Sequence, residues 1–105
     1  MRWQMIVIER MIQEIYPGKQ AELEDIDKRY DAIESTLGFP PKKRFWSIST
    51  LYDSNTIVLE REWESMAAME AAYEKSFANA DIQALHKEGQ DIVKSSRIEL
   101  YTPMT

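Results

Sequence analysis

Hydrophobic positions alternate along some stretches of the chain and recur every three or four residues along others. Stretches rich in β-branched and bulky residues predict strands over residues 3–12, 44–52, 56–63 and 97–102. Steps of three and four predict a long helix after the first strand, with the apolar stripe Leu23, Ile26, Tyr30, Ile33 and Leu37. The same steps follow the third strand, in the stripe Met66, Met69, Tyr73, Phe77, Ile82 and Leu85. The order is therefore strand, helix, strand, strand, helix pair, strand.

Turn and capping residues separate these elements. Gly38 is placed to end the first helix in the left-handed conformation, and Ser65 is placed to cap the start of the second. Asn79 interrupts the later helical sequence, which predicts two helices there. The sequence Asp53-Ser54-Asn55 favours a turn, so the second and third strands are expected to form a hairpin.

This order predicts an α+β fold, a ferredoxin-like βαββαβ sandwich with an antiparallel four-stranded sheet. A chain of 105 residues is long enough for one core, so we expect residues 1–105 to form a single domain. Two right-handed crossovers place the first and third strands at the centre of the sheet, where we expect them to be parallel neighbours.

A charged phrase occurs in both of these central strands. Ile8-Glu9-Arg10-Met11 lies in the first, and Leu59-Glu60-Arg61-Glu62 lies in the third. Charges within a core strand need partners, a cavity or a second subunit. One interpretation is structural ion pairing among these residues, with Arg97 and Glu99 of the last strand. The other is that Glu9 and Glu60 lie side by side in a cavity, where like charge raises one pKa and creates a general base.

Both faces of the central strands carry large apolar side chains. We expect one face to hold Ile6, Ile8, Ile57, Leu59 and Trp63, and the other to hold Met5, Val7 and Val58. Helices cover only one face of such a sheet, and a large apolar face left in water marks an interaction surface. A homodimer in which two sheets pack face to face is the economical prediction. Which face carries a ligand pocket stays open, because the alternation is apolar on both sides.

Composition excludes several classes of function. The net charge of −5 argues against nucleic-acid binding, and the absence of cysteine excludes disulfides and thiolate chemistry. No apolar run is long enough for a membrane span, and the first residues show no signal-peptide pattern, so we expect a cytoplasmic protein. The basic cluster Lys42-Lys43-Arg44 is interpreted as a solvated loop, or as a weak contact for an acidic partner.

Few residues point directly to chemistry. His86 is the sole histidine, which excludes a multi-histidine metal site. It flanks the apolar stripe of the last helix, where it is either a packing residue or a ligand or proton-transfer group facing a cavity. The large aromatic residues Trp46, Trp63 and Tyr73 are either core fillers or the walls of a pocket for a flat ligand.

Two longer segments carry a family resemblance. Val7-Ile8-Glu9-Arg10 leads to Pro17-Gly18-Lys19, and Val58-Leu59-Glu60-Arg61-Glu62-Trp63-Glu64-Ser65 joins a strand to a helix through a tryptophan and a serine cap. With the segment from Met66 to Lys87, they make the chain resemble the dimeric α/β-barrel superfamily. The resemblance is to its antibiotic-biosynthesis-monooxygenase-like (ABM-like) and NIPSNAP-like group, over nearly the whole chain.

The resemblance implies a homodimeric small-molecule-binding protein and, if it is an enzyme, a cofactor-independent monooxygenase acting on an aromatic or quinol-like substrate. His86 or Glu9 would be the base, Arg10 or Arg61 the charge stabiliser, and Trp63 and Tyr73 the pocket walls. The alternative is a non-catalytic dimeric binding or structural module.

A third alternative is a haem-degrading monooxygenase. Haem-degrading members of the group use a helix histidine, a helix tryptophan and a first-strand asparagine. His86 matches the histidine, whereas Tyr73 or Ala72 falls near the tryptophan position and Glu9 stands at the asparagine position. We therefore expect no cofactor. Haem is the one cofactor that the resemblance offers as an alternative.

Overall fold

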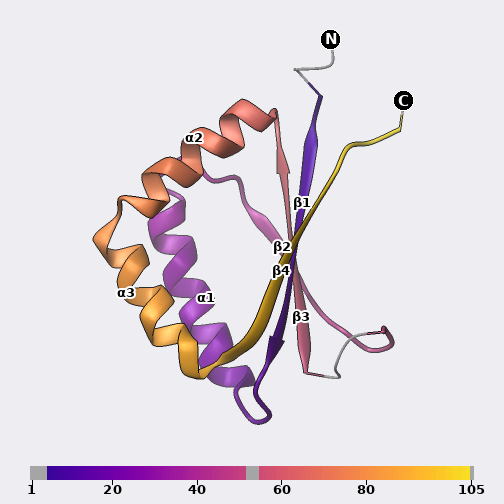
Figure 1. Cartoon of the computed structure of the whole chain (residues 1–105), viewed down its shortest axis with the longest axis vertical. Coiled ribbons are helices and arrows are strands. Elements are labelled where there is room, and N and C mark those ends of the chain that lie inside the picture. Colours follow the sequence, from indigo (N-terminus) through magenta and orange to yellow (C-terminus); the bar gives the residue numbers. More distant parts are fainter. Residues whose placement is uncertain (1–4, 52–54, 105) are drawn as a thin grey trace.

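The elements follow the predicted order in a computed structural model that describes residues 5–51 and 55–104. They are β1 (Val7–Ile15), α1 (Gln20–Glu34), β2 (Lys42–Trp46), β3 (Thr56–Trp63), α2 (Met66–Phe77), α3 (Ala80–Glu88), the short 3-10 helix η2 (Gly89–Asp91) and β4 (Val93–Tyr101). One layer is a four-stranded sheet, and α1, α2 and α3 form a second layer on one side of it (Figure 1). The predicted α+β ferredoxin-like fold is confirmed.

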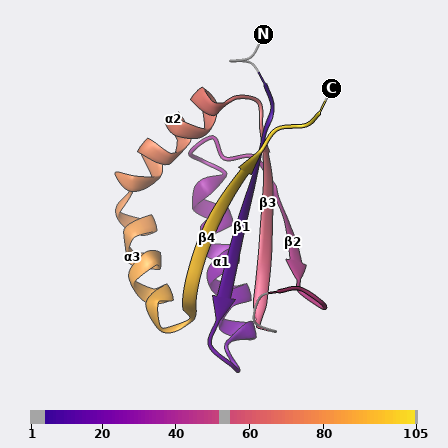
Figure 2. The same ribbon diagram turned by 45° about the vertical axis from the view of Figure 1, so that its right-hand side comes forward.

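The sheet has the order β2-β3-β1-β4, and every pair of neighbours is antiparallel (Figure 2). The first and third strands are central neighbours as predicted, but the prediction that they are parallel is wrong. The chain passes from β1 through α1 to β2, which lies two positions away, and β3 then inserts between them. Because β3 returns from β2 through a hairpin, it runs opposite to both of its neighbours.

The antiparallel register sorts the strand residues onto two faces. Glu9 lies opposite Arg61, and Arg10 lies opposite Glu60. Side chains on a strand alternate between faces, so Glu9 and Arg61 point toward the helices while Arg10 and Glu60 point away. Val7 shares the helix side with the inward-facing residues of β3, which are Ile57, Leu59, Arg61 and Trp63. The predicted grouping of apolar residues by face was therefore wrong.

Two apolar clusters join the helices to the sheet, one at each end of β1. The first contains Val7, Phe39, Trp63, Met69 and Ala72, and it holds α2 against the start of β1. The second contains Ile15, Leu23, Ile26, Ile57, Leu85 and Ile92, and it holds α1 and α3 against the end of β1. Between these two clusters lies the middle part of the interface between the helix layer and the sheet.

Local signals set several element ends as predicted. The Ser65 hydroxyl accepts a hydrogen bond from the Ala68 amide (3.0 Å), and the Asn79 side chain accepts one from the Ile82 amide (3.0 Å). Gly38 follows α1 with a φ of +89°, a conformation that residues with a Cβ rarely adopt. These residues fix where α2 and α3 begin and where the chain leaves α1.

Strand boundaries differ from the prediction in β1, β2 and β4. β1 continues to Ile15, because that side chain enters the second apolar cluster although polar residues precede it. β2 begins at Lys42 and ends at Trp46, and Ile48 beyond it is fully exposed. β4 begins at Val93, which packs on the second cluster. The predicted start of the first strand, Tyr52 and most of the turn at 53–55 lie outside the described residues.

Within the described ranges, no helix has the length and apolar character needed to cross a membrane.

Candidate functional site

A cavity of about 460 Å³ lies between the helix layer and the sheet, in the region between the two apolar clusters. Its floor consists of three rows of side chains that cross the sheet at Glu9, Met11 and Gln13 of β1. Its other walls come from α1, α2, α3 and η2. The volume is within the range of small-molecule sites, so the helix-facing side of the sheet carries a pocket of ligand size.

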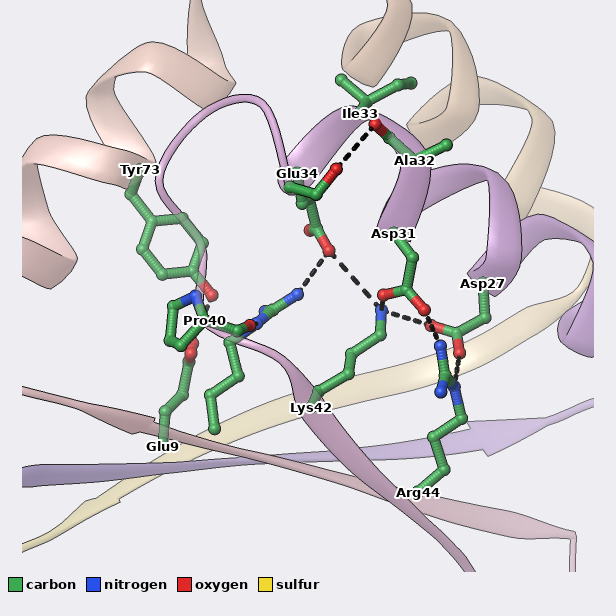
Figure 3. A network of polar contacts seen from close by, with 12 residues as sticks. Glu9, Asp27, Asp31, Ala32, Ile33, Glu34, Pro40, Lys42, Arg44 and Tyr73 are labelled. Atoms are coloured by element: carbon green, nitrogen blue, oxygen red, sulfur yellow. Dashed lines mark hydrogen bonds and ion pairs between the residues drawn. The ribbon is translucent and has the colours of Figure 1, made fainter.

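Glu9 forms one end of this floor. The residue is 3% exposed, and one carboxylate oxygen accepts a hydrogen bond from Trp63 Nε1 at 2.9 Å. The other carboxylate oxygen accepts a hydrogen bond from the Tyr73 hydroxyl (Figure 3). Two neutral donors from β3 and α2 thus fix the orientation of a buried carboxylate that borders the cavity.

Tyr73 is held as the proton donor of this pair. Burial raises the pKa of the Tyr73 hydroxyl far above its ordinary value, and the hydrogen bond and negative charge of Glu9 raise it further. The phenol therefore keeps its proton at neutral pH and cannot act as a base. Of the two groups, Glu9 is the one able to take a proton from a bound molecule.

A network of ion pairs forms one side of the cavity between α1 and the strands β2 and β3 (Figure 3). Lys42 has a 4% exposed side chain, and its Nζ lies 2.5 Å from Asp27, 3.3 Å from Asp31 and 3.5 Å from Glu34. Arg44 pairs with Asp27 and Asp31. These cations are not a solvated loop, because the extended chain at Lys42 and Arg44 directs both side chains toward α1. That prediction was wrong.

Arg61 continues the network toward Glu9. Its guanidinium pairs with Glu34, and its Nε donates a hydrogen bond to the Pro40 carbonyl at 3.1 Å. It also lies over the Phe39 ring, 4.8 Å from the ring centroid. Arg61 therefore lines the cavity, and its hydrogen bonds go to protein groups.

His86 also lines the cavity, but not beside Glu9. It lies on α3 next to Leu85, which belongs to the cluster at the far end of β1, and its ring contacts Tyr30 at a centroid distance of 5.7 Å. Burial, together with the charges of Glu34 and Glu88, raises the pKa of Tyr30 to about 12. The two candidate bases, Glu9 and His86, thus belong to opposite ends of one cavity.

The remaining predicted site residues lie elsewhere. Arg10 is on the opposite face of the sheet, where its Nε lies 3.0 Å from Glu60 and its guanidinium lies over Tyr101. Glu60 is therefore not beside Glu9, since the antiparallel register separates the two carboxylates by the thickness of the sheet. Trp63 is a core residue that supports Glu9 through its indole N–H, and it is not among the residues that line the cavity.

Sequence reasoning missed the acidic stripe of α1 and the polar residue Gln13. Asp27, Asp31 and Glu34 recur at steps of four and three, the helical spacing that placed the apolar stripe. That spacing could have predicted carboxylates aimed at the cations of β2. Gln13 follows Glu9 and Met11 with the period of a strand, but the predicted strand ended at residue 12, before Gln13.

The lining does not fit the haem-degrading alternative. Of the three residues that this alternative implies, only His86 is present, and it lies against Tyr30. Glu9, at the expected asparagine position, is a buried carboxylate that already binds Trp63 and Tyr73. Among the described residues, no group of three histidine or carboxylate side chains is arranged to hold a metal ion.

No protein-family model and no curated protein matches the sequence. Several solved structures nevertheless share its fold. An uncharacterised NIPSNAP-like domain protein from Burkholderia xenovorans has a TM-score of 0.80 at 13% identity, over 97% of this chain and 88% of that one. A NIPSNAP family protein of unknown function from Agrobacterium tumefaciens has a TM-score of 0.79 at 12% identity, over 95% of this chain and 89% of that one.

A mutant of SnoaB, a cofactor-independent oxygenase from Streptomyces nogalater, is similar over 95% of this chain and 94% of that one. Its TM-score is 0.68 and its identity is 17%. At these identities the likeness concerns fold and not activity. The resemblance seen in the sequence is thus confirmed at that level: the chain has the fold of the NIPSNAP-like and ABM-like group.

Proposed function

We propose that this protein binds a small, flat and neutral molecule in the cavity, with a hydroxyl of that molecule donating a hydrogen bond to Glu9. The observation that supports the proposal is a buried carboxylate, fixed by Trp63 and Tyr73, that borders a cavity of about 460 Å³. A carboxylate accepts but cannot donate, so it selects a donor such as a phenol.

The charges of the lining favour a neutral ligand over an anion. The cavity is lined by three carboxylates and two cations, and both cations already pair with carboxylates. An acidic ligand would therefore meet no unpaired cation and would lie near Glu9. We expect biphenyl-4-carboxylate to bind more weakly than 4-phenylphenol, which has the same rings.

We further propose that the reaction, where one occurs, is a monooxygenation without a cofactor. Glu9 accepts the phenolic proton, and the resulting electron-rich anion reduces dioxygen. For a substrate whose phenol is the enol form of an activated methylene ketone, as in anthrone, the anion adds dioxygen at the former methylene carbon. Glu9 returns its proton to the resulting peroxide. Cleavage of the O–O bond then leaves one oxygen atom as the new carbonyl and the other as water, which carries that proton and the remaining hydrogen of the carbon, so dioxygen is the only oxidant required. The NIPSNAP-like and SnoaB folds are consistent with this assignment.

Calorimetric titration with 4-phenylphenol tests binding, and oxygen uptake with anthrone tests turnover. We expect Glu9→Gln to weaken 4-phenylphenol binding at least about tenfold, because a hydrogen bond to an ionised group is lost. Glu60→Gln on the opposite face is the matched control and leaves binding unchanged. Equal affinity in the wild type and the Glu9 variant would contradict the proposed site. Binding without oxygen uptake above the buffer rate would favour the non-catalytic binding module.

We also propose that the protein is a homodimer formed through the open face of the sheet. On this face the described helices provide no cover, and Ile6, Phe45 and Tyr101 are each at least 40% exposed. The Arg10–Glu60 pair places both signs of charge on the same face, which suits contact with a second copy. We expect Phe45→Glu to shift sedimentation from dimer to monomer, whereas Lys75→Glu, at an exposed position of α2 in the helix layer, should leave the dimer intact.

A further inference from the structure

The end of the cavity opposite Glu9 is lined by polar side chains. They are Gln13 of β1, Ser96 of β4, His86 of α3 and Gln90 of η2. Within residues 5–51 and 55–104, no side-chain hydrogen bond or ion pair joins any of the four to another residue. The charged residues of the lining, by contrast, are paired with one another or with Tyr73 and Trp63.

Gln13 and Ser96 are cross-strand partners, so their side chains lie side by side on the helix-facing surface. His86 and Gln90 belong to the segment that covers this surface. The neighbouring residues Leu85 and Ile92 pack with Ile15, two positions beyond Gln13. The four groups therefore face one end of the same space from the sheet and from the helix layer.

An apolar band separates this end from Glu9. Met11 lies midway along β1, flanked by Leu59 of β3 and Ile98 of β4. All three line the cavity. Glu9 and Gln13 lie on the same face four residues apart, about 13 Å along the strand. Along that length the floor is polar at Glu9, apolar at Met11 and polar again at Gln13.

We propose that Gln13 and Ser96, with His86 and Gln90 facing them, form a second polar subsite that binds a neutral hydrogen-bonding group at the far end of the ligand. This inference rests on the proposed function, because Glu9 must hold the first hydroxyl. The ligand class follows from the floor: an elongated apolar molecule with a hydroxyl at one end and a hydroxyl or carbonyl at the other. Gln13 is then a specificity-determining residue that selects ligands by length and by their second polar group.

Two probes with the same rings isolate the subsite. 4-Phenylphenol has one hydroxyl, and 4,4′-dihydroxybiphenyl adds a second at the opposite end. We expect the second hydroxyl to tighten binding about three- to tenfold in the wild-type protein, as one additional neutral hydrogen bond does. In Gln13→Leu we expect the ratio of the two affinities to fall to about one. Ser96→Ala should reduce the ratio as well, and Ser95→Ala, on the opposite face, should retain it.

The outcomes separate the two proposals. If both probes bind the wild type equally, while Glu9→Gln weakens both, the subsite is overturned and the proposed function stands. If the ratio persists in Gln13→Leu and in Ser96→Ala, the subsite is likewise overturned. If neither probe binds the wild type, the proposed function fails and the subsite fails with it. Because Ser96→Ala removes one exposed hydroxyl only, the test remains decisive even if Gln13→Leu does not fold.

Discussion

The Glu-Arg phrase occurs in both central strands, and its charged side chains bond to different kinds of partner on the two faces of the sheet. On the helix side, Glu9 and Arg61 are directly opposed but bond to different partners, Glu9 to Trp63 and Tyr73, and Arg61 to Glu34 and Pro40. On the open side, Arg10 and Glu60 bond to each other at 3.0 Å, with side chains 39% and 27% exposed.

This difference in bonding partners follows from the difference in burial between the inner and the outer charges. A buried carboxylate or guanidinium must fill several hydrogen-bonding positions at once, so it recruits partners from helices and loops. A half-exposed pair is completed by water and needs only its neighbour. The inner charges are therefore tied to the tertiary structure and to the cavity, whereas the outer pair depends on the sheet alone.

The sharpest contrast is expected between Lys42 and Lys43, adjacent residues of β2 on opposite faces. Lys42→Ala leaves the carboxylates of Asp27, Asp31 and Glu34 with one cation fewer in a buried setting, which costs about 3–5 kcal/mol of unfolding free energy. Lys43→Ala, at an exposed position, should change it by less than about 0.5 kcal/mol. Urea unfolding followed by tryptophan fluorescence measures both. Equal losses would contradict a burial-based distinction.

A smaller contrast separates Glu9 from Glu60. Glu9→Gln removes a charge that accepts hydrogen bonds from Trp63 and Tyr73, so we expect a loss of about 1.5–3 kcal/mol in unfolding free energy. Glu60→Gln weakens a half-exposed ion pair and should cost no more than about 1 kcal/mol. Repeating the urea titration in high salt should diminish only the Glu60 effect, since salt screens exposed charges. A salt-sensitive Glu9 effect would mean that this carboxylate is reached by solvent.

The smallest effect concerns pH and Tyr30 at the far end of the cavity. Its folded pKa is raised to about 12 from an ordinary value of 10.0, so the folded state retains a proton that the unfolded state loses. The resulting contribution to stability is complete below pH 10 and disappears as pH rises through 12. Thermal unfolding between pH 9 and pH 12 should show this decline, and Tyr30→Phe should make it shallower. An unchanged slope in the variant would assign the decline to other groups.

Periodicity in the sequence was enough to predict the fold, because each element buries a face whose spacing is local. Ser65, Asn79 and Gly38 act on their own neighbours, so their roles could be predicted as well. The direction of β3 relative to β1 was missed although the hairpin implied it. Only the antiparallel register places Glu9 opposite Arg61 and separates it from Glu60.

The site was only partly predictable, since its contacts depend on how the helices dock. The sequence left Glu9, Tyr73 and His86 open between a structural role and a place at a cavity, and nothing local to α2 places Tyr73 over Glu9. Arg10 was misplaced because a one-residue step along a strand changes the face. Lys42 was misread because its partners lie on a different element.

The register of the charged phrases also bears on how the chain finds its partner strand during folding. In an antiparallel alignment, Glu9-Arg10 is complementary to Glu60-Arg61, but it is equally complementary to Glu9-Arg10 of another molecule. Until β3 and β4 pair with the two edges of β1, an intermolecular pairing of two β1 strands satisfies the same charges. Refolding yield after dilution from denaturant should therefore fall as protein concentration rises, because β1 can pair with a second molecule before its own neighbouring strands protect it.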